Sequence, residues 1–227
     1  MNALAKFVVC LCIAAFMPFS IDALENGIEV SGSSDVRVPP DIANFSFAIS
    51  DRGNDLVAMK KSMDQKSSTI VALCKKLGVD RSDISSTEIS IHPQYNYQTR
   101  DFLGYDLSRV IQVTLHGLEK YSDLVNGAIE AGVTNINRIT LDTSTRDAVE
   151  REALTEASES AKKKAQLLAQ SHGVELGRLL SIEERGQFSE DRKFLYQERA
   201  VAAQNSGAFE PGEISIRATI VVKYAIQ

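Results

Sequence analysis

A Gly-Val pair recurs three times in this chain, each time between a helix-like pattern and an apolar strand-like pattern, in the segments LGVDRSDI, AGVTNINRI and HGVELGRLL. Glycine leaves a helix through a left-handed residue at the lowest cost, so Gly78, Gly132 and Gly173 are predicted helix ends. Their uneven spacing argues against a solenoid. The repeats predict an α+β fold of duplicated β-α-β units, with a mixed, largely antiparallel sheet and amphipathic helices packed on it. The alternative is that a common helix end recurs by chance.

Alternation of apolar and polar residues predicts the strands. The predicted strand ranges are 27–33, 42–50, 84–97, 104–115, 136–141, 178–183 and 213–225. Residues 84–97 and 104–115 read as the two arms of a hairpin. Pro39-Pro40 lacks two backbone donors, so we expect a bulge, an edge or a corner there.

Three segments carry the helical period: 54–77, 118–131 and 146–172. In the first, apolar residues form one stripe, and Asn54 is a plausible N-cap. The longest helix has alanine at every fourth position, namely Ala153, Ala157, Ala161, Ala165 and Ala169. Such a stripe lets a helix approach its neighbour closely. The helix then either lies flat on the sheet or uses Ala153, Ala157, Ala161 and Ala165 as a subunit interface.

The amino terminus reads as a secretory signal. Lys6 precedes an apolar run over residues 7–17, which is too short for the roughly twenty residues that cross a bilayer. Cleavage after Ser20 or after Ala23 fits the small residues there. We therefore predict a signal peptide at 1–23, export, and one soluble domain at 24–227.

Charge and cysteine content exclude several classes of function. A net charge of −5 and the absence of tryptophan argue against nucleic-acid binding. Cys10 and Cys12 leave with the signal, so Cys74 has no partner for an intramolecular disulfide. Cys74 lies on the apolar stripe of the first helix. A buried, inert thiol is expected there, and a redox sensor is the alternative.

No catalytic or metal-binding pattern stands out in the sequence. His92, His116 and His172 lack the spacing of a zinc site. Ser31 and its neighbours lack the Gly-x-Ser-x-Gly context of a nucleophile. We expect no enzyme activity, no catalytic residue, no metal and no cofactor.

The most site-like residues are Tyr95, Tyr97, Arg100 and Tyr105, which gather at one end of the predicted hairpin. They are candidates for a ligand pocket, for a subunit contact, or for half-buried cover. Residues 186–212 mix charged and small residues without a period. A connection of this length inside a domain is either an exposed excursion or a partner-binding arm.

Several short segments together resemble the SIMPL-domain family of bacterial periplasmic and outer-membrane-associated proteins. The matching segments are Val30-Ser31-Gly32, 38–43, 77–79, 83–84, 93–97, 104–105, 131–133, 136–137, 153–154, 164–165, 168–169, 173–174, 176–178 and 210–213. Ser34 departs from the pattern, because the family usually has glycine there, and a positive φ would strain serine.

The resemblance implies an α+β fold, export to the periplasm or outer membrane, and a link to envelope or oxidative stress. It also implies self-association into a homo-oligomer. Envelope proteins are further candidate partners. The family has no assigned catalytic residue to carry over. A small-ligand binding module with a tyrosine-lined pocket is the alternative function.

Overall fold

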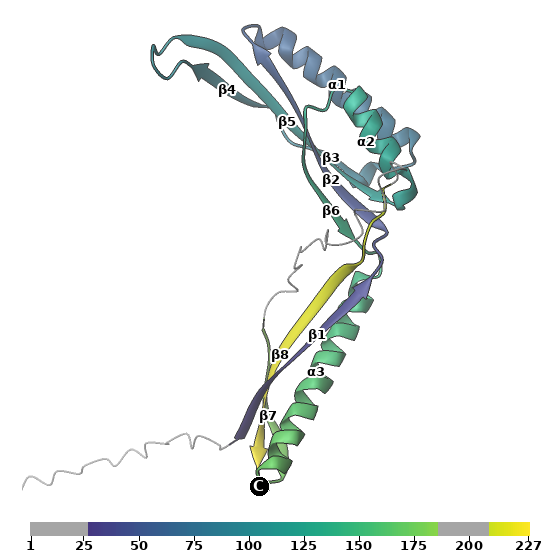
Figure 1. Ribbon diagram of the computed structural model, residues 1–227. Coiled ribbons are helices and arrows are strands. Elements are labelled where there is room, and N and C mark those ends of the chain that lie inside the picture. The colour runs from purple at the N-terminus through teal and green to yellow at the C-terminus, as the bar shows by residue number, and fades with distance from the viewer. Residues whose placement is uncertain (1–26, 186–208) are drawn as a thin grey trace, which may run out of the picture.

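The computed structural model describes residues 27–185 and 209–227, arranged as two lobes that lie end to end (Figure 1). The predicted signal at 1–23 and most of the segment 186–212 lie outside the described residues. The two-helix lobe is formed by residues 41–142. The one-helix lobe is formed by residues 27–38, 146–184 and 214–226.

The two-helix lobe is a five-stranded antiparallel sheet covered by two helices. Its strands are β2 (Ile42–Gly53), β3 (Ile84–Ser86), β4 (Ser90–Tyr95), β5 (Phe102–His116) and β6 (Asn135–Asp142). Its helices are α1 (Leu56–Lys76) and α2 (Tyr121–Glu130), and short 3-10 turns lie at Arg81–Asp83 and Leu118–Lys120. The order β3-β5-β2-β6, with β4 also on β5, makes two split β-α-β units.

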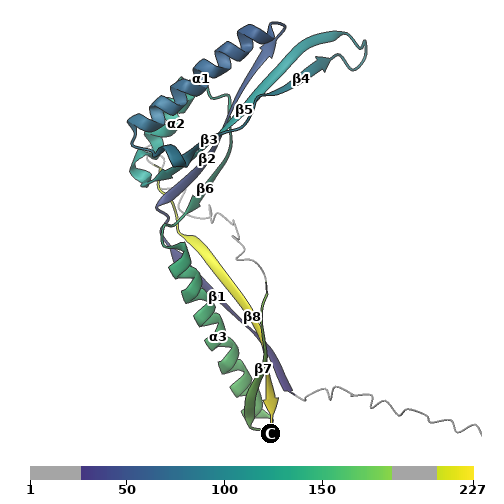
Figure 2. The same cartoon turned by 180° about the vertical axis from the view of Figure 1, so that it is seen from behind.

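The one-helix lobe repeats the split β-α-β unit once. Its strands β1 (Gly27–Val38), β8 (Ile214–Ile226) and β7 (Leu176–Glu184) form an antiparallel sheet in that order. Helix α3 (Arg146–Ser171) runs along one face of this sheet, as the view from behind also shows (Figure 2). The predicted α+β class and repeated β-α-β units are therefore confirmed. The division into two sheets was not predicted.

The core of the two-helix lobe is built from alternating strand residues. In β2, Ala43, Phe45, Phe47 and Ile49 are buried, and the residues between them face outward. Helix α1 contributes the predicted stripe to this core, including Met63, Ile70 and Cys74. Both helices pack on the same face, because residues of α2 belong to the same cluster.

All three predicted helix ends have the same geometry. Gly78, Gly132 and Gly173 have positive φ angles of 79°, 96° and 68°. After each glycine, the valine N–H donates to the carbonyl five residues earlier, at 2.9–3.0 Å. This bond is typical of the Schellman motif, so the repeated Gly-Val pair encodes one type of helix ending.

Three local predictions need correction. Asp55, not Asn54, caps α1, because its carboxylate accepts hydrogen bonds from the N–H groups of Val57 and Ala58 at 3.0 Å. The single strand predicted at 84–97 is divided into β3 and β4. Ser34 carries no positive φ; it pairs with Ala218 in the sheet, and its hydroxyl donates to the Ala153 carbonyl at 2.7 Å.

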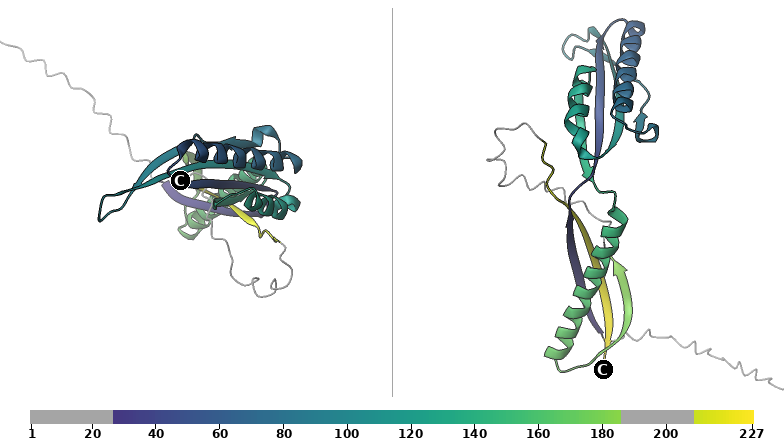
Figure 3. Two further views of the ribbon diagram at one scale, coloured as in Figure 1. Left: turned by 90° about the horizontal axis from the view of Figure 1, so that it is seen from above. Right: turned by 90° about the vertical axis from the view of Figure 1, so that its right-hand side faces the viewer.

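Short connections join the lobes. Pro39-Pro40 stands between β1 and β2, where the chain passes from one sheet to the other, so the structure has the corner among the three predicted alternatives. The Asp41 carboxylate accepts two hydrogen bonds from Ser144, from its N–H at 2.7 Å and from its hydroxyl at 2.5 Å. Phe209, just before β8, stacks on Tyr121 with ring centroids 3.6 Å apart. The right-hand view of Figure 3 shows the lobes meeting at this narrow junction.

Candidate functional site

The β4–β5 hairpin brings two of the predicted tyrosines together through a residue that sequence reasoning missed. Phe102 contacts both Tyr95 and Tyr105, edge to face, with ring centroids 5.6 Å and 5.0 Å apart. Phe102 and Tyr95 are opposite one another in the strand register, which the sequence pattern alone did not indicate. Such edge-to-face contacts stabilise a cluster by about 0.5–1.5 kcal/mol per pair.

The other two candidates lie in the turn that joins the strands. Tyr97 is fully exposed, and Arg100 has a φ of 62°, the positive value of a left-handed residue. The Arg100 N–H donates to the Asn96 carbonyl at 2.8 Å, which closes the turn. Tyr95 and Tyr105 therefore lie in the body of the hairpin and Tyr97 and Arg100 in its turn, and a ligand pocket there stays a prediction. Tyr95, Phe102 and Tyr105 form the aromatic cluster, and the turn is its tip.

This hairpin projects at the end of the molecule opposite the carboxyl terminus (Figure 1). Its apolar side chains are only partly covered, and about half of the surface of Ile91, Tyr95, Phe102 and Leu103 is exposed. We call these four residues with Tyr97 the hairpin patch. Large exposed apolar side chains gathered on one hairpin are typical of surfaces that contact another molecule.

The alanine stripe of α3 has a different environment. Ala153, Ala157, Ala161 and Ala165 are fully buried within the chain itself. The first three pack against Ala218, Ile220 and Val222 of β8, and α3 also contacts β1. Helix α3 thus lies flat on the sheet with its alanine stripe against the strands, as one of the two alternatives predicted. The subunit-interface alternative stays a prediction.

Glycine makes this close approach of helix and strand possible. A Cβ atom at Gly32 of β1 would collide with the Ala157 carbonyl oxygen and would lie 2.6 Å from the Ala161 nitrogen. No side chain fits in that space. The helix backbone therefore rests almost directly on the strand.

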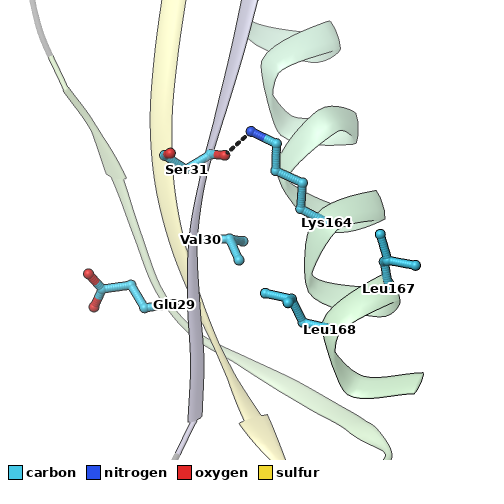
Figure 4. A pocket seen from close by; sticks show the side chains of 6 residues that line it. All are labelled: Glu29, Val30, Ser31, Lys164, Leu167 and Leu168. Carbon is cyan, nitrogen blue, oxygen red and sulfur yellow. Dashed lines mark hydrogen bonds between the residues drawn. The ribbon is translucent and has the colours of Figure 1, made fainter. Parts of the chain in front are cut away.

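Two adjoining hollows lie beside this contact, between β1 and one flank of α3. The first is lined by Glu29, Val30, Ser31, Lys164, Leu167 and Leu168 (Figure 4). The second is lined by Ser33, Ser34, Glu156, Glu159, Ser160, Lys163 and Lys164. Together they form what we call the β1–α3 groove. The Lys164 ammonium crosses it and donates to the Ser31 carbonyl at 2.8 Å.

The titratable groups do not form a reactive centre in the part of the chain that is described. Burial raises the pKa of the Cys74 thiol to about 11, so the reactive thiolate is scarce. His116 Nε2 lies 3.3 Å from the Asp83 carboxylate, and no described hydrogen bond joins a histidine to a serine or cysteine side chain. Over residues 27–185 and 209–227, no three His, Cys, Asp or Glu side chains gather closely enough to hold a metal ion.

Three carboxylates are held in their ionised form by hydrogen bonds. Ser215, followed by Arg217, lowers the pKa of Asp35, and Ser144 lowers that of Asp41. Lys60, followed by Arg109, lowers the pKa of Asp64. All three pairings connect separate elements or stabilise a helix surface. We therefore assign them a structural role.

Among the described helices, none combines the length and apolar character that crossing a bilayer requires. The chain is similar to two proteins named YggE, from Edwardsiella ictaluri and from Escherichia coli K12, each 30% identical over 68% of the chain. These alignments span 66% and 64% of the relatives' own length, less than two thirds. The 26 kDa periplasmic immunogenic protein of Brucella melitensis is 25% identical over 88% of the chain and 84% of its own length.

The model of the SIMPL family, described as a protein of unknown function (DUF541), matches residues 28–224. The match extends across both lobes, and it includes the three Gly-Val helix ends and the aromatic hairpin. The chain belongs to the SIMPL family.

Proposed function

We propose that this protein is exported to the periplasm and acts there without catalysis, by assembling into a homo-oligomer. The Brucella relative is named as a periplasmic protein, which supports the compartment. The single observation that supports assembly is the hairpin patch, whose aromatic and aliphatic side chains are exposed on a projecting hairpin. Burial of such side chains is worth about 25 cal/mol per Å² of apolar surface.

Export is tested by expressing the full-length chain in a Gram-negative host and separating its compartments. We expect the protein in the periplasmic fraction, with an amino terminus at residue 21 or residue 24. Protein with an intact amino terminus in the cytosol would contradict this part of the proposal.

Assembly is tested by light scattering on the periplasmic protein over a range of concentrations. We expect an oligomer whose mass falls when Tyr97 and Phe102 are both replaced by serine. The matched control replaces Ser46 and Gln112, two polar residues of the open sheet face in the same lobe, by alanine. A monomer at all concentrations would refute self-assembly. A loss of mass in both variants would show that the hairpin patch is not the cause.

The proposal includes a link to envelope or oxidative stress, and we propose that Cys74 is not its reactive group. Its thiol is fully buried, and its raised pKa keeps it protonated. We expect Cys74→Ser to retain any stress phenotype of the gene, measured by survival in peroxide. Loss of the phenotype in a variant with unchanged circular dichroism would assign the thiol a direct role.

A small-ligand module is the second candidate, and the contact of Tyr95, Phe102 and Tyr105 is the observation that favours it. The cluster offers aromatic edges to an apolar ligand without an enclosed cavity. A thermal-shift screen with envelope metabolites separates the two functions. Stabilisation that Tyr95→Ala abolishes would support the ligand module.

A further inference from the structure

The one-helix lobe is an incomplete copy of the two-helix lobe. In the one-helix lobe the chain order is β1, α3, β7, β8, and β8 lies in the sheet between β1 and β7. In the two-helix lobe β2 and α1 are followed by β3, β4 and β5, and β5 lies between β2 and β3. The two-helix lobe then adds α2 and β6, and β6 pairs with β2, the first strand of its unit. In the one-helix lobe, β1 has the place of β2. Among the described strands, it pairs only with β8.

The edge of β1 that faces away from β8 carries backbone groups that pair with no other described strand. The Ser31 carbonyl points to that side and accepts its hydrogen bond from Lys164 (Figure 4). Backbone groups alternate between the two sides of an antiparallel strand, so Glu29, Ser33, Asp35 and Arg37 face the same edge. A row of such groups is a template for another strand.

The sequence of β1 is complementary to itself when it is reversed about Ser33. In this antiparallel register, Glu29 lies opposite the partner's Arg37, Val30 opposite the partner's Val36, and Ile28 opposite the partner's Val38. Both side chains are exposed, and the positive charge of Arg37 also contributes to the lowered pKa of its neighbour Asp35. Opposite charges in directly opposed positions stabilise strand pairs.

The neighbouring flank of α3 has the same self-complementary charge pattern. Glu156 and Glu159 come first along the helix, and Lys163 and Lys164 follow one turn later in the β1–α3 groove. Within one copy, Lys163 Nζ lies 3.7 Å from the Glu159 carboxylate, an exposed pair that a second copy can exchange. A two-fold axis reverses the direction of the second helix. The glutamates of one copy therefore approach the lysines of the other.

We propose that a second copy of this chain adds its β1 to this edge, antiparallel and centred on Ser33, and so forms a continuous sheet from the three strands of each copy. The proposal rests on the self-assembly proposed above, and it names one of the contacts. The interface is isologous, because each copy gives and receives the same strand. The second β1 fills the place that β6 occupies in the two-helix lobe.

Charge reversal tests the register. Glu29→Arg and Arg37→Glu each place like charges opposite one another at both ends of the paired strands. We expect each to raise the dimer dissociation constant on the order of tenfold in sedimentation equilibrium. The double variant E29R/R37E restores the pairs and the affinity. Glu88→Arg and Arg138→Glu, two exposed positions in the two-helix lobe, are the controls for net charge.

The outcomes separate this inference from the proposed function. A wild-type protein that stays monomeric refutes self-assembly and the β1 contact together. A wild-type oligomer that is unaffected by E29R and R37E, or is not restored in the double variant, refutes the β1 contact alone. Circular dichroism of each variant verifies that it is folded.

A disulfide at the proposed axis gives a second measurement. Opposed residues of a hydrogen-bonded antiparallel pair have Cα atoms about 5.5 Å apart, within the range of a disulfide. We expect Ser33→Cys to form a covalent dimer under mild oxidation. Ser181→Cys, on β7 at the opposite edge of the sheet, is the matched control and stays monomeric on a denaturing gel. Equal cross-linking of both variants, or none in S33C, would overturn the register.

Discussion

The two lobes stabilise the same β-α-β unit in different ways. In the two-helix lobe, large side chains such as Phe47, Ile70 and Leu107 fill the space between sheet and helices. In the one-helix lobe, α3 presents alanine and β1 presents Gly32, so the backbones themselves come close. Packing in the two-helix lobe depends on large side chains, and packing in the one-helix lobe depends on small ones. We therefore expect the lobes to respond to opposite kinds of substitution.

Loss of volume in the two-helix lobe has the largest expected effect. Phe47→Ala removes a fully buried ring that stacks on Phe45, with ring centroids 5.2 Å apart. We expect the free energy of unfolding to fall by about 3–5 kcal/mol, measured by urea denaturation. Ser46→Ala, on the opposite face of the same strand, should change it by less than about 0.5 kcal/mol. Equal effects would mean that this core is not the source of stability.

Gain of volume in the one-helix lobe comes next. Gly32→Ala forces β1 and α3 apart, and we expect a loss of about 1–3 kcal/mol in the same measurement. Gly212→Ala is the control, because beyond its chain neighbours no atom lies within 4 Å of the place that the added methyl group would take. An unchanged midpoint for G32A would show that the helix moves away from the strand without cost.

The junction between the lobes has the smallest expected effect. Asp41→Asn, at the exposed junction, should lower the free energy of unfolding by less than about 1 kcal/mol. For comparison, Asp55→Ala removes the cap of α1 and should lower it by about 1 kcal/mol. The Ser144 hydrogen bonds lower the pKa of Asp41 in the folded protein. The contribution of Asp41 to the free energy of unfolding is therefore present above the pKa of the unfolded chain, and it is lost as the pH falls through the lower pKa of the folded protein. Wild type and D41N should converge in stability below pH 3.8, and a constant difference at low pH would contradict this assignment.

Local patterns predicted the fold well where the physical cause is local. The Gly-Val pairs predicted three helix ends with one geometry, because positive φ and the following bond involve residues only five positions apart. Alternation predicted the buried face of β2, and the alanine spacing predicted the buried face of α3 as one of two alternatives. The position of the cap of α1 was wrong by one residue, because Asn54 and Asp55 are both good caps.

The candidate site was only partly predictable. Tyr95 and Tyr105 were identified from their residue type, but Phe102 was missed because its place depends on the β4–β5 register. The β1–α3 groove joins residues more than 120 positions apart, and no local period indicates such a contact.

The sequence by itself determined the three helices, their glycine ends and the positions at which α3 has no bulky side chain, because each follows from short-range sterics and periodicity. Only the tertiary structure decided that the strands divide into two sheets and that β1, among the described strands, pairs on one side alone. Those features depend on which distant strands pair, and strand pairing is a competition among all the edges that the folded chain brings together.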